Sequence, residues 1–228
     1  MSTLLAIMSC HRYDYVFPGF VDWFTRPVVD RISGIRESWL KDVTIDYKIF
    51  YGAGQRQPSS DEVFLNCRDG YFYSFEKIRA IIQYALSNGY DYLLKCDDDV
   101  YVYWDRLLRN MPTADYVGRG QGWAVEEGGK SFATPFAPGP TYGLSRRSME
   151  YLITSPLGAW AEDRWVGESL QRGGIGLTVE NRFHLVRPTR TCQYMSDAEL
   201  DSPNDYLTIH SLSPEQMVRH WRRNRAAS

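Results

Sequence analysis

The chain of 228 residues is 43% hydrophobic and 14% aromatic, which is enough to bury one large core and excludes a disordered or fibrous protein. Its 26 basic and 28 acidic residues nearly balance, which excludes a general attraction to nucleic acid or to an anionic membrane. Four scattered cysteines without a Cys-x-x-Cys pair argue against a zinc site and favour reduced thiols, with a disulfide left open as the alternative. We therefore expect one globular domain over residues 1–228.

The N-terminal segment does not have the pattern of a signal peptide or a membrane anchor. Its apolar run is short and no basic residues precede it, and no other stretch of the sequence is long and apolar enough to span a bilayer. We therefore expect a cytoplasmic protein, either bacterial or viral in a host cytoplasm.

The first half alternates predicted strands and helices. We expect strands at residues 4–8, 44–51 and 92–94, and amphipathic helices at residues 27–40 and 73–87, the first beginning at Pro27 and the second ended by Asn88-Gly89. This order predicts an α/β fold with a central, mostly parallel sheet flanked by helices.

Three consecutive carboxylates, Asp97, Asp98 and Asp99, end the strand at residues 92–94, and a second β-prone run follows them. In an open α/β sheet, ligands bind at the carboxyl ends of the strands, so acids at this point lie where a ligand site forms. Their mutual repulsion is relieved by a divalent cation, and such ions are held by one or two carboxylates together with substrate phosphates. Asp97 and Asp99 are the predicted metal and nucleotide unit; the alternative is a solvated acidic turn.

The second half continues with a predicted helix at 104–111, a strand at 115–118 and loops rich in glycine and proline at 118–143. Trp123 and Tyr142 belong to these loops and are candidates for stacking on a sugar acceptor; the alternative, and the commoner role of an aromatic in a loop, is local packing. A helix at 146–153 follows with Ser145 as its N-cap, and residues 175–180 are a further predicted strand.

Asp163 is the candidate acid of the helix that starts near residue 162. Val166 and Leu170 mark the buried side of this helix, and Asp163 lies on the same side in the first turn, whereas Glu162 is rotated away from it. We therefore expect Asp163 to point inward. Glu162 is a weaker candidate for holding a hydroxyl of the acceptor.

His210 follows a β-like run and stands just before a well-defined helix start. Ser213 and Gln216 form a predicted capping box, with Pro214 at the first helical position. An imidazole at this point is held rigidly enough to serve as a ligand.

Five segments along the chain together resemble the inverting β-1,3-glycosyltransferases, which include fringe, the β-1,3-galactosyltransferases and the β-1,3-N-acetylglucosaminyltransferases. The segments are, in order, Arg-Ile-Ser-Gly-Ile-Arg-Glu-Ser-Trp at 31–39, Tyr-Leu-Leu-Lys-Cys-Asp-Asp-Asp-Val at 92–100, Tyr-Gly-Leu-Ser-Arg at 142–146, Glu-Asp-x-x-Val-Gly at 162–167 and Ile-His-x-Leu-Ser-Pro at 209–214. Arg164 departs from the family pattern, in which a valine follows Glu-Asp. Animal members also carry an anchor, a stem and lumenal disulfides; we expect none of these here, so the family's location in the secretory pathway is not carried over. Within such a domain we expect a donor-binding part at about 1–105 and an acceptor-binding and catalytic part at about 106–228.

The resemblance implies a GT-A type nucleotide-sugar fold. It implies that Asp97 and Asp99 serve the metal and the donor, that His210 is a metal ligand and that Asp163 is the catalytic base. Manganese is the expected metal, with magnesium as the alternative, because a nitrogen ligand favours transition ions. We also assign Asp98, Arg36 and Lys77 to donor binding.

The expected reaction is transfer of a hexose or pentose from a nucleotide sugar, most simply a UDP-sugar, to a hydroxyl of a glycan, a glycoconjugate or a modified nucleic acid. A metal neutralises the leaving diphosphate and a base activates the acceptor, so a single displacement with inversion follows. Two alternatives stay open: a metal-dependent phosphoryl or nucleotidyl transferase, for which no Gly-x-x-x-x-Gly-Lys loop is present, and a non-catalytic carbohydrate-binding module.

Overall fold

The computed structural model describes residues 1–11, 30–127, 130–158, 161–185, 195–201 and 204–226, and for residues 71 and 122–134 it describes the backbone alone. No helix among these residues is long and apolar enough to cross a membrane.

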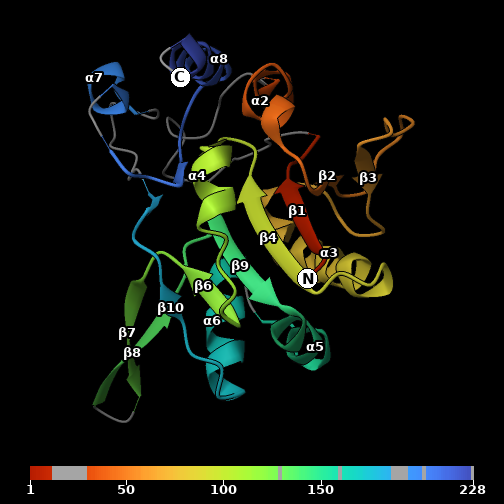
Figure 1. Cartoon of the computed structure of the whole chain (residues 1–228). Coiled ribbons are helices and arrows are strands. Elements are labelled where there is room, and N and C mark those ends of the chain that lie inside the picture. Colours follow the sequence, from red (N-terminus) through yellow and green to blue (C-terminus); the bar gives the residue numbers. More distant parts are fainter. Residues whose placement is uncertain (12–29, 128–129, 159–160, 186–194, 202–203, 227–228) are drawn as a thin grey trace, which may run out of the picture.

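The described residues form twelve strands, seven α-helices and two short 3-10 helices, drawn in Figure 1. In chain order they are β1 (Thr3–Met8), α2 (Arg31–Arg36), η1 (Trp39–Asp42), β2 (Asp46–Tyr51), β3 (Glu62–Phe64), η2 (Tyr71–Tyr73), α3 (Ser74–Ser87), β4 (Tyr92–Asp97), β5 (Tyr101–Val102), α4 (Trp104–Arg109), β6 (Tyr116–Gly118), β7 (Gln121–Glu127), β8 (Lys130–Phe136), β9 (Thr141–Ser145), α5 (Arg146–Thr154), α6 (Glu162–Arg172), β10 (Thr178–Val179), β11 (Phe183–His184), α7 (Asp197–Leu200), β12 (Thr208–Ile209) and α8 (Pro214–Ala226).

Seven strands form the central sheet in the order β10-β6-β9-β4-β1-β2-β3. Neighbouring strands are parallel except at β9, which runs antiparallel to both β4 and β6. The predicted fold class, an α/β domain with a mostly parallel central sheet flanked by helices, is confirmed. The parallel strands place the carboxyl ends of β1, β2 and β4 at one edge, which is where the acidic turn begins.

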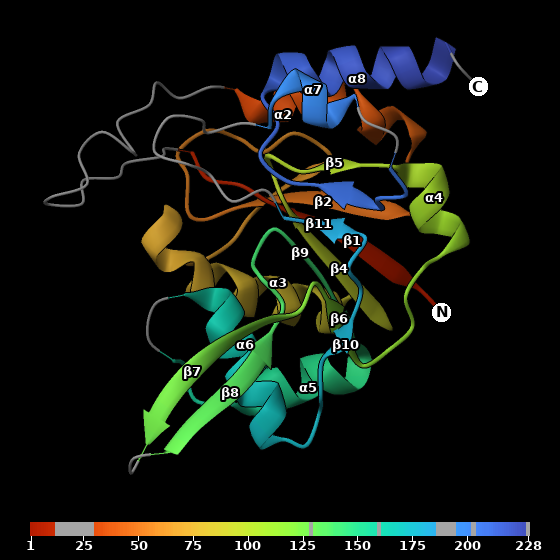
Figure 2. The same cartoon turned by 90° about the vertical axis from the view of Figure 1, so that its left-hand side faces the viewer.

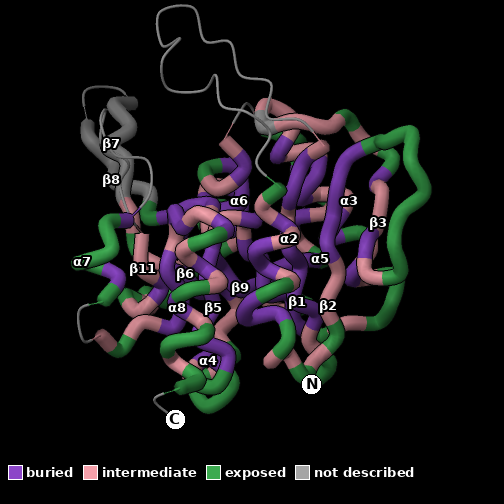
Figure 3. Tube along the Cα trace, turned by 90° about the horizontal axis from the view of Figure 1, so that it is seen from above, coloured by how far each residue is buried: buried purple, intermediate pink, exposed green. Residues whose placement is uncertain are grey.

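Helices cover both faces of the sheet, as Figure 2 shows, with α2 and α8 on one side and α3, α5 and α6 on the other. Alternation along β1 supplies both cores, because Leu5 and Ile7 face the α2 and α8 side whereas Leu4 and Ala6 face the α3 side. Figure 3 shows that buried residues run through the middle of the sheet, while exposed residues gather in loops at the rim such as the connection into β3.

A second, three-stranded sheet with the order β11-β12-β5 lies beside the end of β4. β12 is antiparallel to β5, with Thr208 opposite Val102 and Ile209 opposite Tyr101. The pairing continues past the strands, because the Leu212 amide donates to the Asp99 carbonyl at 3.1 Å. This small sheet thus brings the end of β12 onto the acidic turn.

The helix expected at residues 27–40 is shorter in the structure. Pro27 lies outside the described residues, and α2 ends at Arg36 before the 3-10 turn η1. The Ser38 hydroxyl donates to the Gly34 carbonyl at 2.6 Å, and such side-chain bonding competes with continuation of a helix. Gly34 itself allows close packing of α2 on α8, because a Cβ there would lie 2.5 Å from the Cα of Pro214.

The prediction of loops at residues 118–143 is wrong. Most of this segment forms the hairpin of β7 and β8 and the strand β9, which is inserted between β4 and β6. The glycines that suggested loops mark close approach instead: a Cβ on Gly143 would lie 2.2 Å from the hydroxyl of Tyr92. The strand expected at 175–180 is reduced to the two residues of β10.

Candidate active site

The acidic turn connects β4 to β5 and is held by backbone contacts from three directions. The Asp97 amide donates to the Pro140 carbonyl at 2.9 Å, the Val100 amide donates to the Asp97 carbonyl at 3.3 Å, and the Trp39 indole donates to the Val100 carbonyl at 3.0 Å. These bonds fix the turn at the end of a strand whose other residues are buried. The three carboxylates therefore point in defined and different directions.

His210 meets the acidic turn at Asp99. The imidazole Nε2 lies 3.5 Å from Asp99 Oδ1, and both side chains are 15% exposed. His210 follows β12 directly, its amide donates to the His184 carbonyl at 3.1 Å, and the next residue, Ser211, adopts a positive φ of 65°. The predicted capping box below it is confirmed by hydrogen bonds of 3.0 and 3.2 Å between Ser213 and Gln216. His210 and Asp99 are thus brought together, as expected.

Asp98 is the most buried member of the triplet, at 3% exposure. It accepts a hydrogen bond from the Ser9 hydroxyl at 2.6 Å and another from the Arg31 guanidinium at 3.1 Å. Arg31 also reaches Asp99 Oδ2 at 3.3 Å, so it partly balances two of the three acids. Burial, with the charge of Asp99 beside it, raises the pKa of Asp98 well above its ordinary value. Asp98 therefore ties the turn to β1 and α2.

Asp163 lies in the first turn of α6, half-buried, and faces the segment that leads into β9. Its Oδ2 accepts from the Gly139 amide at 3.1 Å and its Oδ1 from the Arg164 amide at 2.7 Å. Burial first, and then the charge of Glu162, raise the pKa of Asp163 from 3.8 to about 6. A carboxylate with such a pKa is available as a proton acceptor near neutral pH.

The expectation that Glu162 turns away from the interior is wrong. Glu162 is only 8% exposed, and its Oε1 lies 3.2 Å from the Nζ of Lys95. Both acids face inward because α6 begins at Glu162, after Ala161 in an unusual backbone conformation with a φ of 92°. Helical spacing from Val166 does not fix the direction of the very first residue of a helix.

Lys95 connects the acidic turn to α6 and was missed in the sequence. It is fully buried in β4, and its Nζ contacts Asp97 Oδ1 at 2.6 Å, Glu162 Oε1 and the Gly139 carbonyl. Burial opposes its charge, but Asp97 and Glu162 outweigh burial, so the pKa of Lys95 is raised and the ammonium stays charged. The feature of the sequence that could have revealed this residue is a lysine within an otherwise apolar strand.

Asp97 takes part in this network rather than in the contact between Asp99 and His210. Burial raises the pKa of Asp97; Lys95 acts in the opposite direction, and the charge of Asp99 adds to the increase. For Asp99 burial also favours the neutral form, but His210 and Arg31 outweigh it and the pKa is lowered.

The described residues hold no group of three or more His, Cys, Asp and Glu side chains placed to bind a metal. Asp99 and His210 form a pair of oxygen and nitrogen donors, which suits a transition ion that takes further ligands from a nucleotide.

The two basic residues assigned to donor binding have protein partners in the structure. Arg36 contacts Asp61 at 2.7 Å and Glu62 at 3.2 Å. Lys77 is 2% exposed and donates to the Ser9 carbonyl and to Asp69. Lys77 thereby supports the segment whose hydroxyl binds Asp98, whereas Arg36 belongs to an ion-pair cluster at β3.

The expectation that Tyr142 stacks on an acceptor is wrong. Its side chain is fully buried in β9 and its ring lies edge-on to Tyr116, with 6.4 Å between the ring centroids. Residue 142 lies in a central strand, not in a loop, so its ring packs inside the domain. The side chain of Trp123 lies outside the described residues, and its contact with an acceptor remains a prediction.

No family model matches the chain, but comparison with curated proteins finds similar hydroxyproline O-galactosyltransferases. A hydroxyproline O-galactosyltransferase of Arabidopsis thaliana, GALT5, is 25% identical over 178 residues, which cover 71% of this chain and 26% of that protein. The chain therefore spans about a quarter of the length of this curated relative.

Two solved structures are also similar. A glycosyltransferase involved in the glycosylation of the major capsid of PBCV-1 matches with a TM-score of 0.48 and 12% identity, over 97% of this chain and 100% of that one. A mutant Drosophila β1,4-galactosyltransferase 7 in complex with manganese, UDP-Gal and xylobiose matches with a TM-score of 0.41 and 14% identity, over 79% of this chain and 66% of that one.

Proposed function

We propose that this protein is a metal-dependent, inverting glycosyltransferase that moves a sugar from a nucleotide-sugar donor, most simply a UDP-sugar, to an acceptor hydroxyl. The observation that carries the proposal is the Lys95 network, which joins the acidic turn at Asp97 to the start of α6, where Asp163 has a pKa of about 6. The relative's name, a galactosyltransferase, supports the same reaction class. The specific fringe or β-1,3 type is part of the proposal and rests on the five sequence segments.

The metal in this proposal is manganese, held by Asp99 and His210 with oxygens of the donor diphosphate. The two side chains already approach within 3.5 Å, and an imidazole beside a carboxylate suits manganese better than calcium. When bound, the ion neutralises the charge that develops on the leaving diphosphate. Asp97, which the sequence assigned to the metal, lies on the Lys95 side of the turn, where its carboxylate pairs with the Lys95 ammonium at 2.6 Å.

Asp163 is the proposed general base. It accepts the proton of the acceptor hydroxyl while the acceptor oxygen bonds to the anomeric carbon and the bond from that carbon to the diphosphate oxygen breaks. Because no enzyme carboxylate forms a covalent intermediate in this scheme, the anomeric configuration inverts. The amides of Gly139 and Arg164 hold both oxygens of Asp163 and thus fix its direction.

The test is incubation of the protein with manganese and a panel of UDP-sugars, with measurement of released nucleotide and of thermal stability. A true donor at 100 times its dissociation constant stabilises the fold by about 2.7 kcal/mol. Release of UDP supports glycosyl transfer, release of a sugar phosphate, with or without UMP, indicates a nucleotidyl or phosphoryl transferase, and binding of sugar without any release indicates a binding module. NMR of the first product then shows whether the anomer is inverted.

A further inference from the structure

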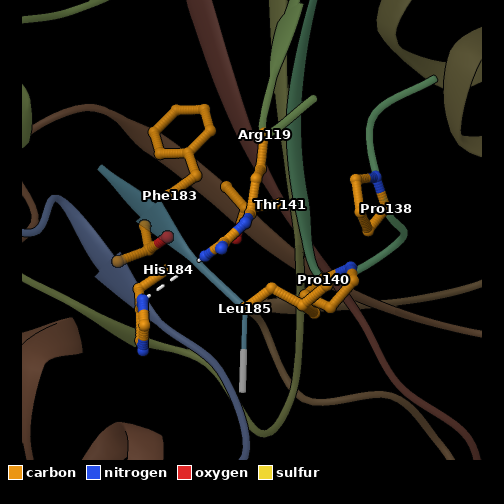
Figure 4. A pocket seen from close by; sticks show the side chains of 8 residues that line it. Arg119, Pro138, Pro140, Thr141, Phe183, His184 and Leu185 are labelled. Carbon is orange, nitrogen blue, oxygen red and sulfur yellow. Dashed lines mark hydrogen bonds between the residues drawn. The ribbon is translucent and has the colours of Figure 1, made fainter. Parts of the chain in front are cut away.

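A small pocket beside the candidate active site is lined by Arg119, Thr141 and His184, together with Thr208 and apolar residues, and Figure 4 shows it from close by. Its volume is about 10 Å³, which is room for one water-sized group and not for a sugar ring. The reaction proposed above uses none of these residues.

The walls of the pocket belong to the same segments that position the candidate catalytic residues. Pro138, Pro140 and Thr141 flank Gly139, whose amide donates to Asp163, and the Pro140 carbonyl accepts from the Asp97 amide. On the opposite wall, the carbonyl of His184 accepts from the amide of His210. The pocket therefore adjoins the base on one side and the proposed metal ligand on the other.

Arg119 brings a positive charge that no acidic side chain among the described residues neutralises. Its Nη1 lies 3.4 Å from Nδ1 of His184, and the two are joined by the dashed line in Figure 4. A guanidinium can only donate, so Nδ1 of His184 accepts this hydrogen bond. The His184 ring is fixed by stacking on Tyr206, with 4.1 Å between the ring centroids. The arginine is thus held in place without being balanced.

Thr141 adds a second donor that has no partner. The residue is 5% exposed, and its buried hydroxyl makes no hydrogen bond within the described part of the chain. A buried hydroxyl without a partner is unfavourable for folding. A guanidinium and a hydroxyl that line one small cavity together favour an oxygen acceptor that carries negative charge.

We propose that this pocket is an oxyanion subsite that binds one oxygen of a carboxylate or phosphate group of a substrate. Its volume admits a single oxygen atom, while the rest of the charged group and of the substrate stays in the adjoining site. Two sources fit this chemistry, namely an acidic group on the acceptor and the diphosphate of the donor. Only the assignment of the source rests on the proposed function; the recognition of an anion does not.

The test is equilibrium binding by calorimetry of two matched pairs of probes, glucuronate against glucose and UDP against uridine, without metal. We expect Arg119→Gln to weaken binding of at least one anionic probe by about tenfold or more, with Arg119→Lys intermediate. Loss of glucuronate binding assigns the pocket to the acceptor, and loss of UDP binding assigns it to the donor. The control is Arg147→Gln. It removes an exposed arginine of α5 that pairs with Asp115, and it should change the binding of neither glucuronate nor UDP.

Thr141→Val separates binding from folding. The two side chains have nearly the same shape, so removal of a hydroxyl without a partner should leave the melting temperature equal or higher, while anion binding weakens by about threefold to tenfold. The proposal is overturned if wild-type protein binds neither anion at millimolar concentration, or if all Arg119 and Thr141 variants bind both anions within twofold of wild type. None of these measurements needs turnover, so a missing transferase activity with intact anion binding would count against the proposed function alone.

Discussion

Replacement of Asp163 by asparagine should stabilise the protein at neutral pH and inactivate it. Folding raises the pKa of this carboxyl from 3.8 to about 6, because the half-buried charge is poorly solvated and lies beside Glu162. A raised carboxyl pKa means that the folded state prefers the protonated form. The ionised form therefore costs stability: the penalty begins near pH 3.8, grows until about pH 6 and is constant above it.

The size of the effect follows from the pKa difference. A pKa that is higher by about 2 in the folded state lowers the free energy of unfolding by about 3 kcal/mol at pH 8 and by about half of that at pH 5. Asparagine removes the charge but keeps only one acceptor oxygen, so the amide of Gly139 or of Arg164 loses its partner. The free energy of unfolding of Asp163→Asn should therefore exceed that of wild type by less than these amounts. The gain should shrink as the pH falls toward 4.

Urea unfolding at pH 5, 6.5 and 8, followed by circular dichroism, measures this difference. Glu168→Gln is the matched control on α6, because it removes a carboxylate that pairs with Arg164 at the surface and should show no comparable dependence on pH. A gain for Asp163→Asn that is equal at all three pH values, or a loss at pH 8, would show that the carboxyl is not held at a raised pKa.

The activity of the same variant tests the role of the base. Asparagine cannot accept a proton, so turnover should fall by roughly 10² to 10⁴ while the dissociation constant for UDP stays the same. Wild-type kcat/KM should also fall as the pH drops below about 6, where Asp163 becomes protonated. Near-normal turnover by a correctly folded Asp163→Asn protein would remove Asp163 from the proposed mechanism.

Three further predictions concern the acidic turn and the helix that follows His210. His210→Ala should raise the manganese concentration needed for UDP binding several-fold in calorimetry, and an unchanged requirement would exclude His210 as a ligand. Asp98→Ala should lower the free energy of unfolding in urea by about 1–3 kcal/mol, because Ser9 and Arg31 lose an acceptor, whereas Asp99→Ala should reduce UDP binding more than stability; the reverse pattern would contradict the roles given to them. Ser213→Ala should cost about 1 kcal/mol in the same unfolding assay through loss of the cap of α8, and no loss would show that the cap is dispensable.

The fold was largely predictable where local pattern and tertiary packing agree. The apolar runs at β1 and β4 and the amphipathic pattern of α3 are regular, and each element forms close to its predicted place. β9 was not predictable in this way, because Gly143 lowers the local preference for a strand. Its strand conformation is imposed from outside, by hydrogen-bonded neighbours on both sides and by the hydroxyl of Tyr92, which leaves room only for a glycine.

The site followed from sequence where chain neighbours determine it. Asp97 ends β4 and Asp99 follows two residues later, and His210 stands three residues before the cap of α8, so their places are set locally. Contacts between distant segments were not accessible: Asp98 is bound by Ser9, 89 residues away, and by Arg31, 67 residues away. Spacing shows that three acids lie together but not which cations balance them.

Lys95 explains why the buried acids of this site can coexist in one fold. Glu162 and Asp97 contact the same ammonium, and a buried carboxylate is strongly unfavourable without such a partner. Asp163, one residue after Glu162, has no contact of this kind with the ammonium and bonds instead to two backbone amides. The neighbouring acids are therefore held differently: Glu162 is neutralised by a fixed cation, whereas Asp163 keeps a raised pKa and can exchange its proton near neutral pH. That difference, rather than burial alone, is the reason for proposing Asp163 rather than Glu162 as the base.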